Sequence, residues 1–462
     1  MSPQRELAAD LAALRDLPVF LAYNANVDAV VDVGPELEAD LDPPIGEPGA
    51  SEPPDRLASK ADLATAIAHT MATGEGDEVA MTASLATELE ATLDPDATQM
   101  GGQAGIMTNL LSSLGAAPIV YTYLLSETQQ SMFERPDRIR YPAVADGTVS
   151  FVPVGDATNT DRTKINWIFE FAAGASFFGV RADANTRFIA ASRPPEFDLH
   201  AGDLDAVVDQ VGTAVDGALL AGYHNLTPEH VERGYEETLR HARETLRRLR
   251  SGGDFPVHVE YAVTHDDDLR AAITDVILPE ADVIGLDPHE LAMLQRDVDA
   301  AVVSADELPS GDASPAAAIR AHYRALRSLL DHLDVGCVRL HAMDYHLAVT
   351  DDYLPPEAVR RGLEFAAVNA ATKAATGRIT EPSDLETGLA VEPSARGTEA
   401  IAALAATMDA ETNVTDGVLT TPRVAAAPNR VVEDPASTVG IGDIVSASSF
   451  ALEVAITRTD EA

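Results

Sequence analysis

The chain has 462 residues, which suits two domains or one large α/β domain with an inserted piece, and 46% of its residues are hydrophobic, which excludes bulk disorder. Its 75 Asp and Glu against 32 Lys and Arg give a formal charge of −43, which excludes most nucleic-acid partners and argues against an anionic membrane surface. Cys337 is the single cysteine, which excludes an intramolecular disulfide and a cysteine metal cluster.

The first elements in chain order are a helix predicted at 5–16 and a buried strand at 19–23. Residues 1–18 are polar and lack the apolar core of a signal peptide, and no run of eighteen apolar residues follows, so we expect a cytoplasmic protein that spans no membrane. The strand ends in the polar segment NANVDAV, and open α/β sheets bind ligands at such strand ends. Residues 35–56, rich in Pro, Gly and acids, predict a long loop in an inserted subdomain.

Several short strand-like runs lie in residues 147–191, which favours a small sheet over a cleft. From about residue 205, apolar strands alternate with helices, and this rhythm predicts a mostly parallel sheet covered on both faces. The fold class is therefore α/β. We expect a large catalytic domain formed by residues 1–28, 61–146 and 200–462. We expect an inserted, β-rich lid formed by residues 29–60 and 147–199.

The sharpest functional signal is the segment STVGIGDIVSASSF at 437–450. Gly440 and Gly442 allow close backbone approach, and the N–H groups at the start of the following helix form an anion pocket. Asp443 would repel a bound anion, but it suits a base beside a phosphate that is being transferred. The alternative is that Asp443 is an ordinary helix N-cap.

Two carboxylates are predicted to meet at one edge of the sheet. In the apolar segment PVHVEYA, His258 and Glu260 share one face of a strand, and a buried carboxylate there needs a partner or a metal. In GLDPHEL, Asp287 can cap a helix whose first turn contains Glu290. Two such acids suit Mg²⁺, which keeps several waters and binds substrate phosphates. The alternatives are a buried salt bridge for Glu260 and stabilisation by the helix dipole for Glu290.

The motifs, taken in order, resemble the ADP-dependent glucokinase and phosphofructokinase family, a branch of the ribokinase-like sugar kinases. The matching segments span nearly the whole chain: YNANVDAV (23–30), GGQAGIMTNLL (101–111), IFEF (168–171), NTRFI (185–189), GYHNL (222–226), HVE (258–260), GLDPHEL (285–291) and VVEDPASTVGIGDIVSASSF (431–450). One glycine motif would be weak, but the ordered set is specific. The resemblance implies a ribokinase-like large domain, with a mostly parallel sheet flanked by helices, and a smaller lid.

The resemblance also implies roles for single residues. Asp443 matches the base that takes the proton from the sugar hydroxyl, and Gly440 and Gly442 match the anion hole for the moving phosphoryl group. Mg²⁺ is expected at Glu260 and Glu290, with Asp443 beside them. The implied positions for sugar are Asn26, Asp28, Gly102 and Gln103, and the implied position for adenine is Val432. ADP would be the phosphoryl donor and would leave as AMP.

Some positions depart from the family pattern on the nucleotide side. Asp287 stands where the metal motif usually begins with Asn, which adds negative charge near the phosphates of the nucleotide. Met343 and Asp344 stand at the family's usual His-Thr pair near the nucleotide. Asn166 replaces a sugar-binding His ahead of IFEF. The assignment of ADP as phosphoryl donor therefore rests on the family resemblance. A ribokinase-like kinase with another donor or acceptor is an alternative.

The choice of sugar depends on charge in the predicted lid. A phosphosugar needs cationic groups for its phosphate, and Lys164 and Arg187 are the candidates. Against this, Glu78 falls near a sugar-binding carboxylate of glucose-using relatives. We expect fructose 6-phosphate as acceptor, with glucose as a second substrate. A catalytically weak sugar- or nucleotide-binding regulator is the non-enzyme alternative, and a monomer or homodimer is expected.

The net negative charge of the chain is expected to reflect the habitat of the organism rather than the chemistry of the active site. An acidic, heavily hydrated surface suits a salt-rich cytoplasm, where screening removes most self-repulsion. Lysine is also scarce, since the chain contains only Lys60, Lys164 and Lys373. We therefore expect a halophilic, haloarchaeal source, with an acidic binding surface as the alternative.

Overall fold

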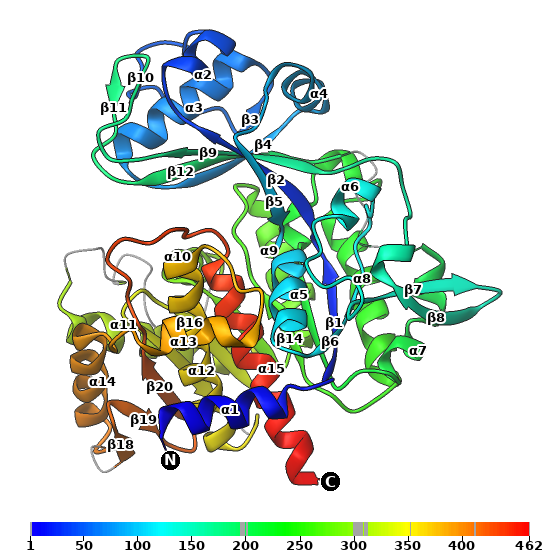
Figure 1. Ribbon diagram of the computed structural model, residues 1–462, viewed down its shortest axis with the longest axis vertical. Coiled ribbons are helices and arrows are strands. Elements are labelled where there is room, and N and C mark those ends of the chain that lie inside the picture. The colour runs from blue at the N-terminus through cyan, green and yellow to red at the C-terminus, as the bar shows by residue number, and fades with distance from the viewer. Residues whose placement is uncertain are drawn as a thin grey trace.

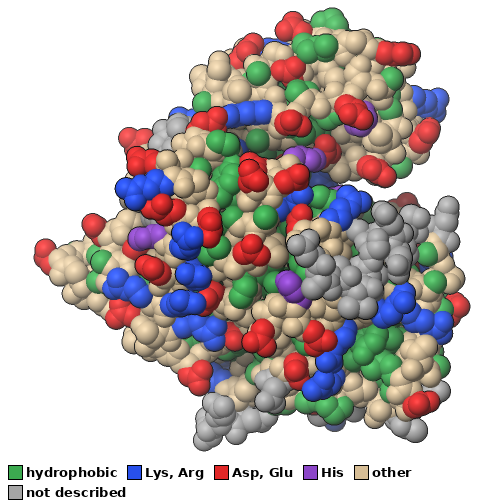
Figure 2. Space-filling view, turned by 180° about the vertical axis from the view of Figure 1, so that it is seen from behind, with side chains coloured by type: hydrophobic (Ala, Val, Ile, Leu, Met, Phe, Trp, Pro, Cys, Tyr) green, Lys and Arg blue, Asp and Glu red, His purple; other side chains and the backbone are tan. Residues whose placement is uncertain are grey.

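The computed structural model describes residues 2–194, 199, 202–298, 308, 313–351, 353–410 and 413–461. The described chain forms a large domain and a smaller lid, each built on its own sheet (Figure 1). Among the described helices, none combines the length and apolar character that crossing a bilayer requires. Acidic side chains are spread over both parts on the face shown in Figure 2.

The large domain is centred on a sheet with twelve strands among the described residues. Most of its central strands are buried on both faces, as expected where helices cover both sides. The strand order is β18 (Val414–Thr415), β19 (Val418–Thr420), β20 (Val424–Pro428), β17 (Tyr345–Thr350), β16 (Cys337–His341), β15 (Val283–Leu286), β14 (Val257–Glu260), β13 (Gly217–Ala221), β1 (Pro18–Tyr23), β6 (Ala117–Val120), β7 (Arg140–Ala145) and β8 (Thr148–Pro153).

The strands from β16 to β7 pair in parallel, and antiparallel strands lie at the two ends of the sheet. Parallel neighbours need crossover connections, and the long helices of the sequence supply them. The carboxyl ends of β14, β15 and β16 therefore meet at one edge of the sheet. This arrangement confirms the predicted α/β class with a mostly parallel sheet.

Helices cover both faces of the large sheet and pack into two separate apolar cores. One core involves α1 (Pro3–Ala13), α5 (Gln103–Ser113), α12 (Pro356–Thr376), α13 (Leu385–Leu389) and α15 (Ile441–Glu461). The other involves α7 (Asp209–Gly212), α8 (Tyr235–Ser251), α9 (Asp267–Val276), α10 (Pro288–Asp297), α11 (Pro315–Leu333) and α14 (Ala395–Thr407). A one-turn helix, α6 (Glu127–Gln130), lies beside the lid connection.

The lid is a six-stranded sheet whose outer face carries helices. Its order is β3 (Arg56–Leu57), β4 (Asp77–Met81), β12 (Thr186–Ser192), β9 (Ile165–Phe171), β2 (Asn26–Asp32) and β5 (Ala97–Gly101). The aromatic residues of NWIFEF pack in the lid core. The remaining lid elements are α2 (Pro35–Asp40), α3 (Lys60–Thr73), α4 (Ala83–Thr92) and the hairpin β10 (Ser176–Phe177)–β11 (Val180–Arg181).

The two sheets divide the chain differently from the segmentation proposed from sequence. Residues 61–101, which we grouped with the large domain, supply β4 and β5 to the lid sheet, and β8, which we grouped with the lid, joins the large sheet. The strands DEVAM and ATQMG contain too few apolar residues to reveal lid strands. The chain passes between the two parts at residues 23–26, 101–103, 163–165 and 192–194.

Candidate active site

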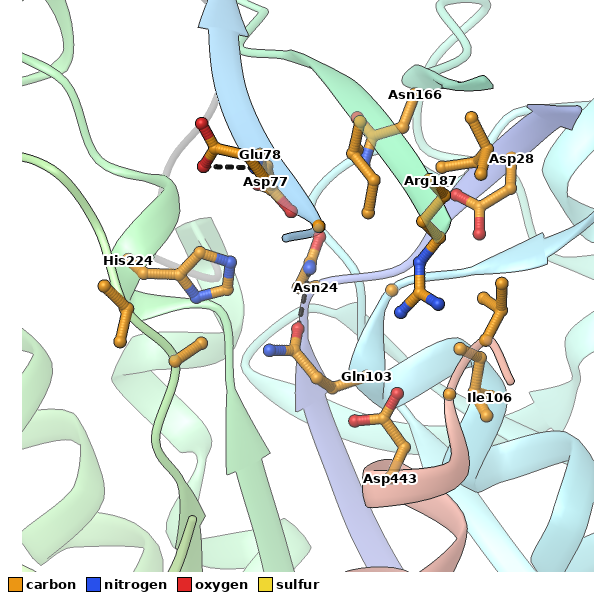
Figure 3. A pocket seen from close by; sticks show the side chains of 18 of the residues that line it. Asn24, Asp28, Asp77, Glu78, Gln103, Ile106, Asn166, Arg187, His224 and Asp443 are labelled. Atoms are coloured by element: carbon orange, nitrogen blue, oxygen red, sulfur yellow. Dashed lines mark hydrogen bonds between the residues drawn. The ribbon is translucent and has the colours of Figure 1, made fainter. Parts of the chain in front are cut away.

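A cavity of about 550 Å³ lies between the lid sheet and the carboxyl ends of the parallel strands (Figure 3). The large domain contributes the start of α5, the first turn of α10 and the turn before α15, and the lid contributes β2, β4, β9 and β12. Many residues selected from sequence line this one cavity: Asn26, Asp28, Glu78, Gly102, Gln103, Asn166, Arg187, Asp287, Glu290, Gly440 and Asp443.

The glycine turn leads directly into α15. Gly440 has a left-handed φ of +70°, and a side chain there would strain the backbone and press against Ile106. At Gly442, a Cβ atom would lie 2.8 Å from Cε1 of His341, so only glycine leaves room for that imidazole. The backbone N–H of Ile444 donates to the Gly440 carbonyl (3.0 Å), which starts the helix. The helix N-terminus therefore faces the cavity, as an anion site requires.

Asp443 is the third residue of α15, in the first turn rather than at the N-cap. Burial, followed by the nearby charge of Glu260, raises the pKa of Asp443 to about 8, although His341 and Lys373 act in the opposite direction. The carboxylate points into the cavity near Gln103 (Figure 3). A carboxyl group with this pKa is a stronger base than an ordinary aspartate.

Glu260, at the end of β14, is held by two histidines. Nε2 of His258 donates to Oε2 (2.8 Å), and Nε2 of His341 donates to Oε1 (3.2 Å). Burial alone would raise the pKa of Glu260, but these two hydrogen bonds outweigh it and lower the pKa to about 2. The carboxylate is therefore charged and paired, which agrees with the salt-bridge alternative without excluding a metal nearby.

Asp287 and Glu290 form a reciprocal cap at the start of α10. The backbone N–H of Asp287 donates to Oε2 of Glu290 (2.7 Å), and that of Glu290 donates to Oδ1 of Asp287 (2.8 Å). Burial and then the charges of Asp287, Glu260 and Asp443 raise the pKa of Glu290 well above its ordinary value. The cavity thus contains a group of acids whose negative charge a cation would relieve.

No cluster of three or more His, Cys, Asp or Glu ligands with metal-binding geometry occurs in the described residues. Structural zinc needs a cage made entirely of protein ligands. Mg²⁺ needs only one or two carboxylates, with waters and substrate phosphates completing its shell. The hard oxygen donors of Glu260 and Glu290 and the unrelieved charge around Glu290 therefore fit Mg²⁺.

Amides and one carboxylate form the polar wall where the chain enters the lid. Asn26 Nδ2 donates to Asp28 Oδ1 (2.6 Å), and Asn24 Nδ2 donates to Gln103 Oε1 (2.8 Å). Burial raises the pKa of Asp28 to about 7, partly offset by the bond from Asn26. Gly102 has φ +73°, and its close approach to Asn24 leaves no room for a side chain. These groups suit hydrogen bonds to sugar hydroxyls.

The cationic candidates lie at different depths. Lys164 is buried, and its Nζ donates to Oδ1 of Asn24 (2.9 Å) and of Asn225 (3.0 Å). Arg187 extends from β12 into the cavity, where Nη1 donates to Oγ1 of Thr438 (2.9 Å) (Figure 3). Arg187 lines the cavity and can reach an anionic ligand held between lid and large domain. Lys164 lies outside the cavity lining, and burial, followed by the charge of Arg193, lowers its pKa well below the ordinary value.

Glu78 lies on β4 of the lid, and its Oε1 accepts a hydrogen bond from Nη2 of the buried Arg193 (2.7 Å). Burial would raise the pKa of Glu78, but Arg193 and His224 lower it overall. On β9, Oδ1 of Asn166 accepts from the backbone N–H of Ser192 (3.0 Å), which leaves its amide nitrogen on the cavity side.

Three nucleotide candidates lie outside the cavity lining. Met343 is 77% exposed, and Asp344 is bonded to Ser394 (2.8 Å) and Arg396 (3.1 Å). The segment containing Val432 is joined to Met343 because Asn429 Nδ2 donates to the Met343 carbonyl (2.8 Å). Gly442 and Glu260 are likewise absent from the lining but contact His341.

Sequence reasoning missed several cavity residues. These are Asn24, Asp77, His224, Asn225, His265 and His289. Asn24 lies in the same NANVD segment as Asn26, so its position after a buried strand was an available signal. His289 lies between Asp287 and Glu290 in the GLDPHEL segment, so its position was also an available signal. His265 had none, because its contact with Asp77 depends on how the lid sits over the sheet.

The fold and the site together define a phosphotransferase of the sugar-kinase type: an acid and an anion-binding turn at a sheet edge, closed by a lid. The chain belongs to the ADP-dependent phosphofructokinase and glucokinase family, because residues 17–452 match the ADP-specific Phosphofructokinase/Glucokinase conserved region. The family resemblance stated from sequence is confirmed, and so is its enzyme class, since the relatives are kinases.

Relatives and solved structures agree along nearly the full length. An ADP-specific phosphofructokinase of Thermococcus zilligii is 30% identical, with 97% of this chain and 98% of the relative covered. An ADP-dependent glucose/glucosamine kinase of Pyrococcus abyssi is 28% identical, with 95% and 94% covered. A solved ADP-dependent kinase in complex with fructose-6-phosphate and ADPβS is 28% identical, with a TM-score of 0.84 and 98% and 97% of the two chains covered.

Proposed function

We propose that this protein is an ADP-dependent kinase that transfers the β-phosphoryl group of ADP to fructose 6-phosphate and releases AMP and a sugar bisphosphate. The observation that carries the proposal is the meeting, in one cavity, of Asp443, the Gly440 turn and the lid residues Asn166 and Arg187. The relatives that bear the phosphofructokinase name support the choice of acceptor. We also place the enzyme in the cytoplasm, as a monomer or homodimer.

Asp443 takes the proton from the attacking sugar hydroxyl. Its raised pKa of about 8 brings it close to working pH, where proton transfer is most effective. The N–H groups behind Gly440 and Gly442, together with the dipole of α15, receive the charge of the moving phosphoryl group. Because this transition state is loose, positioning and electrostatics supply most of the catalysis.

Mg²⁺ would be held by Glu260 and Glu290, directly or through waters, with Asp443 beside it. When bound, the ion neutralises phosphate charge on the nucleotide. Asp287 contributes through its cap, which fixes the orientation of Glu290.

The sugar lies against the polar wall of the lid connection. Asn26, Asp28, Gln103 and the backbone at Gly102 face its hydroxyls, and Asn166 adds an amide from β9. For the 6-phosphate, the guanidinium of Arg187 supplies a forked donor. Lys164, buried behind this wall, supports it through its hydrogen bonds to Asn24 and Asn225.

The adenine is expected at the exposed apolar pair Met343 and Val431, next to Val432. Exposed large hydrophobic side chains are few in the described chain, and these are two of them: Met343 lies in the turn between β16 and β17, and Val431 follows β20. A flat base would cover them. Asp344, fixed by Ser394 and Arg396, presents a carboxylate that can accept from an amino group.

A second acceptor is favoured by one observation. Glu78 lines the cavity from β4, and a carboxylate can bind sugar hydroxyls in place of a phosphate contact. Glucose therefore remains a second substrate.

The test is a grid of donors and acceptors with Mg²⁺ in concentrated KCl. ADP and ATP are each paired with fructose 6-phosphate and glucose, and AMP, ADP and the sugar phosphates are quantified. We expect turnover with ADP and fructose 6-phosphate. Turnover with ATP alone would refute the donor assignment, and turnover with glucose alone would refute the acceptor assignment. Sugar and nucleotide binding without turnover in any pair would favour a regulator.

A further inference from the structure

His341 lies at the carboxyl end of β16, between two parts of the active site that come from distant segments. On one side its Nε2 donates to Oε1 of Glu260 on β14 (3.2 Å). On the other side its ring packs against Gly442 so closely that a Cβ atom there would lie 2.8 Å from Cε1. The imidazole therefore fills the gap between an acid of the sheet edge and the anion-binding turn.

The other oxygen of Glu260 is fixed from the opposite side. His258 holds Oε2 at 2.8 Å, and Gly285 on β15 provides the room, because a Cβ atom at Gly285 would collide with both side chains. Each carboxylate oxygen can accept two hydrogen bonds. With one histidine on each oxygen, Glu260 keeps a lone pair on both for a further partner.

The surroundings of His341 differ from those of an ordinary core histidine. The charges of Asp287 and Asp443 act on its ring in addition to that of Glu260, so acids on three elements influence one imidazole. Its cross-strand neighbour His346 on β17 lies opposite it in the register and is fully buried. Variants of His341 and His346 therefore distinguish the effect of packing within the β16–β17 hairpin from the effect of contact with Glu260.

We propose that His341 is a positioning residue for phosphoryl transfer: it orients Glu260 and supports the backbone at Gly442, so that the acid and the anion-binding turn keep a fixed separation. The inference deepens the proposed function and depends on it, because there Glu260 takes part in binding Mg²⁺. Side chains that orient metal ligands in this way typically change metal affinity by about 10–100-fold when removed.

The experiment compares His341→Phe with His341→Gln. Phe keeps a ring against Gly442 but removes the donor, whereas Gln keeps an N–H donor at similar reach. Binding of Mn²⁺ in the presence of ADP is measured by electron paramagnetic resonance, alongside the KM for sugar and the melting temperature. His346→Gln is the matched control, because it changes the same hairpin away from Glu260.

We expect His341→Phe to weaken Mn²⁺ binding by about 10-fold or more, with the KM for sugar and the melting temperature close to wild type. His341→Gln and His346→Gln should stay within a few-fold of wild type. The inference is overturned if His341→Phe binds Mn²⁺ as wild type does, if His341→Gln is as impaired as His341→Phe, or if the only change is a lower melting temperature. Absence of both Mn²⁺ binding and turnover in the wild type would instead refute the proposed function.

Discussion

The large domain and the lid hold their polar groups in different ways. In the large domain, Glu260 is fixed by two histidines and Glu290 by a reciprocal cap, all within the rigid edge of a parallel sheet. The lid meets the large domain through side-chain bridges such as Arg187–Thr438, Asp77–His265 and Arg56–Glu229, which are mostly exposed. The phosphate side is thus preorganised, whereas contacts on the sugar side depend on the lid's position over the sheet.

The largest expected effect is on the preorganised side. Asp443→Asn removes the base but keeps the shape of the turn, so kcat should fall by about 10²–10⁴-fold while sugar binding persists. Steady-state kinetics and calorimetric sugar binding would measure the two quantities. Asp275→Asn, an exposed acid on α9, is the control and should behave as wild type. Persistent turnover in Asp443→Asn would show that another group is the base.

The next effect concerns the stability of the large domain. Arg339 on β16 and Glu453 on α15 are both fully buried, with Nη2 of the arginine 2.7 Å from each carboxylate oxygen. Glu453→Gln leaves a buried cation poorly paired and should lower the free energy of unfolding by about 3–5 kcal/mol. Urea unfolding at constant KCl measures this loss.

The paired change Arg339→Met with Glu453→Leu removes both charges and should recover much of that stability. In the lid, the corresponding pair Arg193–Glu78 is partly exposed on the Glu78 side, so Glu78→Gln should cost less. An equal loss in the two parts would contradict the contrast between a rigid large domain and a more weakly held lid.

Arg187 belongs to the sugar side of the cavity, where contacts depend on the position of the lid. A hydrogen bond to a charged group contributes about 1.5–3 kcal/mol, so Arg187→Ala should raise the KM for fructose 6-phosphate by about 10–100-fold. The KM for glucose, which has no phosphate, should change little. Thr438→Val removes the bridge between lid and large domain but keeps the guanidinium. If Thr438→Val reproduced the full effect, Arg187 would act through the lid's position rather than through substrate phosphate.

The smallest effect is the pH response of the bridge between His265 and Asp77 (3.2 Å). The hydrogen bond to Asp77 raises the pKa of His265 above 6.5, so its stabilisation is present below 6.5 and lost as pH rises through the raised value. The pKa of Asp77 is lowered, chiefly by the bond to His265, so its share is present above 3.8 and lost as pH falls through the lowered value.

The two windows overlap between about pH 4 and pH 6.5, where the bridge contributes up to about 1 kcal/mol, because its members are partly exposed. The melting temperature of wild type should therefore exceed that of His265→Gln near pH 5.5, and the difference should vanish near pH 8.5. A difference that grows toward high pH would contradict the assigned charges.

Periodicity and motif order were enough to predict the α/β class, the parallel sheet and part of the cavity lining from sequence. Asp443, Glu290 and the glycine turn were found because strand ends and helix starts leave clear local patterns. The lid boundary was harder, because β4 and β5 are short, polar strands that become part of a sheet only through pairing with β12 and β2.

The network around Glu260 was also incompletely predicted. His258 shares a strand with Glu260, so alternation placed the two together. His341 comes from a strand some eighty residues later, and only the strand order β14–β15–β16 brings it to the same carboxylate. The pairings of Lys164 with Asn24 and Asn225 and of Glu78 with Arg193 likewise depend on tertiary contacts that no local pattern reports.

The lid is joined to the large domain by four separate chain passages, at residues 23–26, 101–103, 163–165 and 192–194. It therefore cannot be excised or exchanged as a single fragment, since its sheet needs two stretches of chain separated by β6, β7 and β8. During synthesis that sheet stays incomplete until β12 has emerged from the ribosome, long after β2. A circular permutant opened within residues 102–163 would instead move the two lid segments to opposite ends of the chain, and it should assemble the lid later than the natural order does.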